Sequence, residues 1–144
     1  MVKSSVKRVS FFAAFLFLFA CSSANNKPLL IGFNSDSTAI VFKQIEQSGL
    51  LELQQLKPGD SAFNNLVAVL QTPSEKDTSI NEAPVEGRFS VTDSNLVFIP
   101  ARPFVRGRDY LVITHLNAKF GQMKDLLVGE LKNRVKPQQK LLTR

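Results

Sequence analysis

The chain has 144 residues, of which 44% are hydrophobic and 21% charged, so its composition is that of one globular domain and not of a disordered chain. A single cysteine excludes an intrachain disulfide and a cysteine-rich zinc site, and a single histidine excludes metal motifs built on histidine pairs. Charge is unevenly placed: residues 27–99 hold five Lys or Arg against nine Asp or Glu, whereas residues 100–144 hold ten against three.

The first twenty residues have the pattern of an export signal. Lys3, Lys7 and Arg8 open the chain without an acidic residue, and residues 9–20 (VSFFAAFLFLFA) are apolar apart from one serine. A membrane-spanning helix needs about 20 apolar residues, so this stretch is short for a span and is typical of the apolar core of a signal peptide. We therefore expect residues 1–20 to be removed from the mature chain.

The segment Leu18–Ser23 (LFACSS) places the only cysteine at the end of this apolar core. It resembles the lipobox of bacterial lipoproteins, which implies that Cys21 becomes the lipidated N-terminus and anchors the chain to a membrane. In a cell with two membranes, Ser22 after the cysteine implies the outer membrane. The same residues also permit cleavage after Ala24, which would release a soluble protein, or an uncleaved anchor.

Residues 21–27 are small and polar and are expected to form a tether, and residues 28–135 then read as short strands separated by turns. Residues 50–56 (LLELQQL) fit either a helix or a strand. Two of the strands are separated only by the turn residues 93–95 and are therefore expected to form a hairpin. The expected strands are 29–33, 38–42, 65–72, 86–92, 96–99, 110–114 and 126–135. Six or seven short strands in about 110 residues are typical of an all-β antiparallel sandwich.

Residues 87–114 (GRFSVTDSNLVFIPARPFVRGRDYLVIT) resemble the bacterial Ig-like domain of S-layer and other surface proteins. The residues that carry the resemblance are Leu96, Phe98, Pro100, Pro103, Phe104, Gly107, Tyr110 and Val112. The resemblance implies an Ig-like β-sandwich at a cell surface. In such a domain Leu96 and Phe98 point into the core, Phe104 plugs the open edge and Gly107 permits a turn. Tyr110 is expected to bury its ring and to return its hydroxyl to a nearby backbone group.

Residue patterns for catalysis, metal binding and cofactor binding are missing from the sequence. His115 is the only imidazole, and it is expected to lie at the surface or at a strand edge, with Asp109 six residues earlier. No Gly-x-Ser-x-Gly elbow, Gly-rich phosphate loop or calcium-binding loop occurs. We therefore predict a protein that is not an enzyme and that needs neither a metal nor a cofactor.

The candidate partner-binding residues are Arg102, Phe104, Arg106 and Arg108, because three guanidinium groups in seven residues suit an anionic partner and loops on a rigid scaffold carry binding sites. A solvated loop with Phe104 in the core is the alternative. Residues 136–144 are expected to be a basic, fraying tail, and the lack of aromatic residues in it argues against nucleic acid.

The sequence thus predicts a lipid-anchored cell-envelope protein whose Ig-like domain is a non-catalytic binding or structural module for an envelope protein or glycan. Two alternatives are docking on anionic lipid or polysaccharide through the basic C-terminal region and a small secreted hydrolase.

Overall fold

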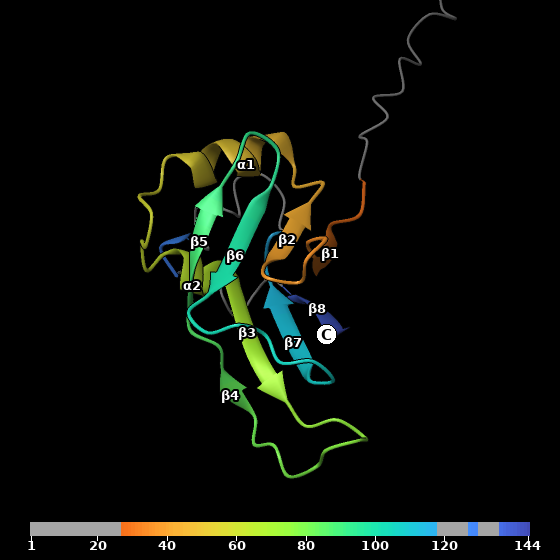
Figure 1. Ribbon diagram of the computed structural model, residues 1–144. Coiled ribbons are helices and arrows are strands. Elements are labelled where there is room, and N and C mark those ends of the chain that lie inside the picture. The colour runs from red at the N-terminus through yellow and green to blue at the C-terminus, as the bar shows by residue number, and fades with distance from the viewer. Residues whose placement is uncertain (1–26, 118–126, 130–135) are drawn as a thin grey trace, which may run out of the picture.

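The computed structural model describes residues 27–117, 127–129 and 136–144, which fold into two antiparallel four-stranded sheets (Figure 1). The strands of the first sheet are, in spatial order, β1 (Leu30–Phe33), β2 (Ile40–Lys43), β6 (Leu96–Pro100) and β5 (Gly87–Val91). Those of the second are β4 (Ala83–Pro84), β3 (Val67–Thr72), β7 (Asp109–Thr114) and β8 (Gln138–Thr143). The predicted all-β antiparallel sandwich is confirmed, and the described residues form eight strands where six or seven were expected.

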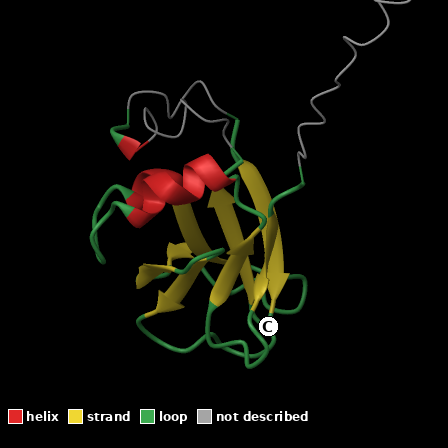
Figure 2. Cartoon of the chain, turned by 90° about the horizontal axis from the view of Figure 1, so that it is seen from above, coloured by secondary structure: helices red, strands yellow, loops and turns green. Residues whose placement is uncertain are grey.

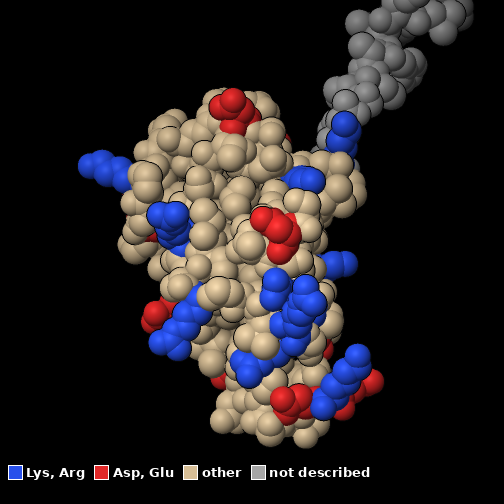
Figure 3. All heavy atoms as spheres, viewed as in Figure 1, with Lys and Arg blue, Asp and Glu red and all other residues tan. Residues whose placement is uncertain are grey.

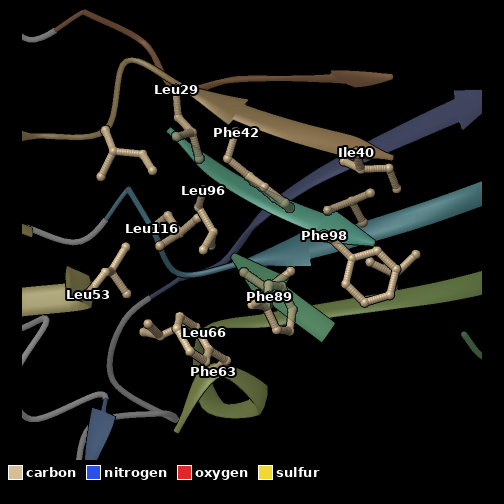
Figure 4. Close-up of a cluster of buried hydrophobic side chains, with 14 of the residues drawn as sticks. Leu29, Ile40, Phe42, Leu53, Phe63, Leu66, Phe89, Leu96, Phe98 and Leu116 are labelled. Atoms are coloured by element: carbon tan, nitrogen blue, oxygen red, sulfur yellow. The ribbon is translucent and has the colours of Figure 1, made fainter. Parts of the chain in front are cut away.

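The core lies between the sheets and is filled by alternate residues of the central strands. On β2 and β6, Ile40 faces Phe98 and Phe42 faces Leu96, and none of these four side chains is more than 3% exposed. Figure 4 shows them packed together in the interior. Val112 on β7 in the second sheet is likewise buried. Full burial of such a side chain contributes about 1.5–3 kcal/mol, so the period-two pattern of these strands determines which face turns inward.

Strands β5 and β6 form the predicted hairpin. The N–H of Thr92 donates to the carbonyl oxygen of Asn95 at 2.8 Å, and the N–H of Asn95 donates to the Thr92 hydroxyl oxygen at 3.0 Å. Farther along the ladder, the ring of Phe98 covers Gly87, so that a Cβ atom on Gly87 would lie only 2.6 Å from the ring. An aromatic ring thus fills the space that the glycine leaves on the strand.

Between β2 and β3 the chain forms two helices. The ambiguous segment 50–56 falls largely within a helix, α1 (Gln47–Gln54), whose Leu50 and Leu53 are buried. Their spacing of three residues places both side chains on one helix face. A second short helix, α2 (Phe63–Leu66), occupies the start of the expected strand 65–72, so that β3 begins only at Val67.

Helix α1 closes one end of the sandwich, where β5 ends and β6 begins, as Figure 1 and the view from above in Figure 2 show. The side-chain amide of Gln54 donates to the carbonyl oxygen of Thr92 at 3.3 Å and joins the helix to the hairpin turn. The loops that connect β1 to β2, β3 to β4 and β6 to β7 lie at the other end (Figure 1). Helix α1 and these three loops thus lie at opposite ends of the sandwich.

The C-terminal region differs from the sequence-based prediction. Residues 138–143, expected to belong to a fraying tail, form β8, which pairs with β7 along its whole length and buries Leu142. The predicted strand 126–135 lies mostly outside the described residues. Within it, residues 127–129 form a helical turn, with Gly129 at a φ of +82°, and are not a strand. The predicted signal peptide and nearly all of the tether, including Cys21, also lie outside the described residues.

Candidate functional site

The loop 101–108 joins β6 to β7 and is held from below by aromatic rings. The ring of Phe104 lies 4.7 Å from that of Tyr110 and 5.1 Å from that of Phe33, measured between centroids. The Tyr110 hydroxyl oxygen accepts the N–H of Val105 at 2.8 Å, as expected for this tyrosine. Phe104 is only 2% exposed. Its side chain is therefore part of the core that supports the loop, as in the alternative interpretation of this segment.

The end of the chain fixes the same loop from the side. The guanidinium Nη1 of Arg144 donates to the carbonyl oxygen of Phe104 at 2.6 Å. The backbone N–H of Arg144 donates to the carbonyl oxygen of Arg108 at 3.1 Å. In return, the N–H of Gly107 donates to the Arg144 carbonyl oxygen at 2.6 Å. Gly107 has a φ of +74°, which side-chain-bearing residues rarely adopt. These bonds hold the loop backbone in one conformation.

The three arginines of the loop differ in their surroundings. Arg108 is half-buried, and its Nη1 donates to the side-chain oxygen of Gln71 on β3 at 2.8 Å. Arg102 and Arg106 are exposed. Arg102 and Arg108 line a groove with a volume of about 540 Å³, whereas Arg106 is not among its lining residues. Figure 3 shows basic side chains gathered on the lower half of this face, where the loop crosses the molecule in Figure 1.

The opposite wall of the groove consists of residues 83–86, which the sequence-based prediction missed. β4 pairs with the end of β3, and the N–H of Val85 donates to the carbonyl oxygen of Val69 at 2.8 Å. The two walls meet where the N–H of Ala101 donates to the Glu86 carbonyl oxygen, also at 2.8 Å. Sheet pairing thus places a proline, a valine and a carboxylate opposite the arginine loop.

The pKa of Asp77, a carboxyl group on the β3–β4 loop, is lowered by its neighbours. The hydroxyl and the backbone N–H of Ser79 both donate to Asp77, and with them the positive charge of Arg108 holds the pKa of the Asp77 carboxyl below its ordinary value. The Ser79 hydrogen bonds are the larger cause and the Arg108 charge is a smaller one. Asp77 is fully exposed, so the attraction acts through water and is weak.

His115 is not at the surface, contrary to expectation. It is 7% exposed, and its backbone N–H donates to the carbonyl oxygen of Leu66 at 2.8 Å. Its Nε2 has no hydrogen-bond partner among the described residues. Asp109 lies at the opposite end of β7, where its carboxylate accepts the hydroxyl of Thr143 at 2.6 Å. At about 3.4 Å per strand residue, the two are too far apart to form a catalytic pair.

Within the described part of the chain, no group of three or more His, Cys, Asp or Glu side chains is placed to hold a metal ion. No helix among the described residues is long and apolar enough to cross a membrane.

Comparison with known proteins finds no family model, no curated protein and no solved structure that matches this chain.

Proposed function

We propose that this protein is a lipid-anchored component of the bacterial cell envelope whose β-sandwich, of the bacterial Ig-like type, is a non-catalytic binding module. The observation that carries the binding role is the arginine-lined groove, whose loop is held in place by Tyr110 and Arg144 before any partner arrives. Preorganised groups lose less conformational entropy when they bind. The lipobox around Cys21 supports the anchor, and Ser22 supports placement in an outer membrane.

The position of the groove suits such an arrangement. The chain from Cys21 reaches the sandwich at the start of β1, whereas Phe33 at the other end of β1 contacts Phe104 beneath the groove. Figure 1 shows the same separation between the beginning of β1 and the loop 101–108. A seven-residue tether spans about 25 Å at most, so the domain stays close to its membrane. The groove thus lies near the end of β1 that is farther along the chain from the tether, which supports access by a partner.

Docking on anionic lipid through the basic residues 136–144 is less well supported. The Arg144 guanidinium donates to the carbonyl oxygen of Phe104, and Leu142 on β8 is buried in the core. Lys136 and Lys140 remain exposed, but two lysines supply only about 1 kcal/mol each at an anionic surface.

The anchor is tested by growing cells with radiolabelled palmitate and comparing the natural chain with Cys21→Ser and a control, Ser23→Ala. We expect label and membrane association in the natural chain and in the control, and loss of both in Cys21→Ser. Two or more acyl chains hold a protein stably, because each buried methylene contributes about 0.8 kcal/mol. Equal labelling of the Cys21→Ser chain would refute the lipid anchor.

A further inference from the structure

We infer that the groove binds an extended peptide segment of a protein partner that carries carboxylate and small apolar side chains. This inference rests on the proposed binding role of the groove and is independent of the lipid anchor. It names the chemistry of the partner, which the proposed function leaves open between protein and glycan.

The charged groups of the groove favour a carboxylate. A guanidinium has five N–H donors in a planar fork that matches a carboxylate. One nitrogen of Arg108 is held by Gln71 at 2.8 Å, which fixes the plane of the group and leaves the other donors for a ligand. Arg102 adds a second, exposed guanidinium on the same loop.

Apart from Gln71 and Glu86, the residues that line the groove beside the arginines are apolar or aromatic, and this favours a peptide over a glycan. Exposed small side chains flank the arginines on both walls. They are Ala83, Pro84, Ala101, Pro103 and Val105. A sugar would place hydroxyl groups against these apolar side chains. The hydroxyl groups would then lack hydrogen-bond partners on that side, which costs free energy. The two rings that line the groove, Phe104 and Tyr110, are 2% and 3% exposed, so neither offers a face on which a sugar could stack.

The backbone of β4 indicates that a bound peptide is recognised through side chains and not through added sheet hydrogen bonds. β4 is the edge strand of its sheet, but its second residue, Pro84, has no N–H to donate to an added strand. A bound peptide therefore gains little from continuing the sheet. Its carboxylates would contact Arg102 and Arg108, and its apolar side chains would lie along the proline and alanine surface.

The groove also carries a charge that opposes such a ligand. Glu86 is exposed at the junction of the two walls. Its carboxylate repels a second carboxylate nearby, so its removal is expected to strengthen the binding of an acidic peptide. This gives the inference a variant that gains affinity, which a loss of folding cannot imitate.

The test is a fluorescence anisotropy titration of the full chain, in non-ionic detergent, with a labelled octapeptide of alternating glutamate and valine. We expect Arg108→Gln and Arg102→Gln each to weaken binding, Arg108→Gln by about tenfold, and Glu86→Gln to tighten it about twofold. Arg88→Gln is the matched control, because Arg88 is exposed on β5 outside the groove, and it should change little. A peptide with glutamine in place of glutamate should bind at least about tenfold more weakly.

Three outcomes would overturn the inference. They are undetectable binding of the acidic peptide, equal loss of binding in Arg88→Gln and Arg108→Gln, and Arg108-dependent binding of oligogalacturonate without binding of the peptide. The last outcome would leave the groove a binding site, so the proposed function would stand while the peptide chemistry fails. Conversely, peptide binding by a chain that takes up no palmitate would support the inference and refute only the anchor.

Discussion

Gly87→Ala should destabilise the sandwich more than its single methyl group suggests. A Cβ atom at this position would lie 2.5 Å from the carbonyl oxygen of Ile99 and 2.6 Å from the ring of Phe98. The oxygen belongs to the backbone of the paired strand β6, so it can move only if the hairpin distorts, and the Phe98 ring is buried. Overpacking of a tight site costs about 1–3 kcal/mol, and a backbone contact this short places Gly87→Ala near about 2–3 kcal/mol.

The measurement is urea unfolding followed by circular dichroism, with Gly32→Ala as the matched control. Gly32 also lies in a strand of the first sheet, but a Cβ atom there would meet no atom within 4 Å. Its stability should stay the same or rise by up to about 1 kcal/mol, because alanine reduces the entropy of the unfolded chain. In thermal unfolding, the melting temperature of Gly87→Ala should fall by roughly 10 °C. Equal midpoints for the two variants would refute the packing described for β5 and β6.

Tyr110→Phe removes the hydroxyl that accepts the N–H of Val105 at 2.8 Å, and it should lower the free energy of unfolding by about 1 kcal/mol and speed hydrogen exchange at Val105; unchanged exchange there would show that this bond does not hold the loop. In an NMR titration, the pKa of Asp77 should lie below its ordinary value, and Ser79→Ala should raise it more than Arg108→Gln does. Because this pKa is lowered on folding, the carboxylate stabilises the folded chain above its ordinary pKa, and this contribution disappears as the pH falls through the lower, folded value. A larger shift in Arg108→Gln than in Ser79→Ala would reverse the assigned order of causes.

Local patterns were sufficient to locate most strands. The hairpin of β5 and β6 follows from alternating residues such as Phe89 and Val91 on either side of a turn, and its closure depends on neighbouring residues alone. Helix α1 could not be distinguished from a strand, because Leu50, Leu53 and their neighbours fit both periods. What selects the helix is that its leucines pack against the end of the sandwich, which is tertiary information.

Strand β8 shows why the C-terminal end was missed. It lies at the edge of its sheet, and Leu142 is its one buried side chain. The preceding residues Lys140 and Leu141, whose side chains point to opposite faces of the strand, are both exposed. With a single inward residue there is no alternation to detect, and the basic charge is typical of a solvated tail. The strand exists because β7 offers a full row of backbone partners.

The sequence predicted one wall of the groove, the loop 101–108, but not the other wall, residues 83–86. The arginines of the loop 101–108 form a local cluster, and the prediction that Tyr110 bonds to the backbone correctly located the support of the loop. Of residues 83–86, by contrast, the sequence-based prediction assigned only Glu86 to a strand (86–92) and none to a site, and only the pairing of β4 with β3 places them opposite Arg102. The alternative that Phe104 belongs to the core is the one that the structure favours.

The mass of the N-terminal peptide of the mature chain, extracted from membranes and measured by mass spectrometry, tests the proposed anchor most directly. We predict a chain that begins at Cys21 and carries the added mass of a diacylglyceryl group and a further acyl chain. A chain that begins at Asn25 with no added mass, recovered from the soluble fraction, would contradict a lipid-anchored binding module.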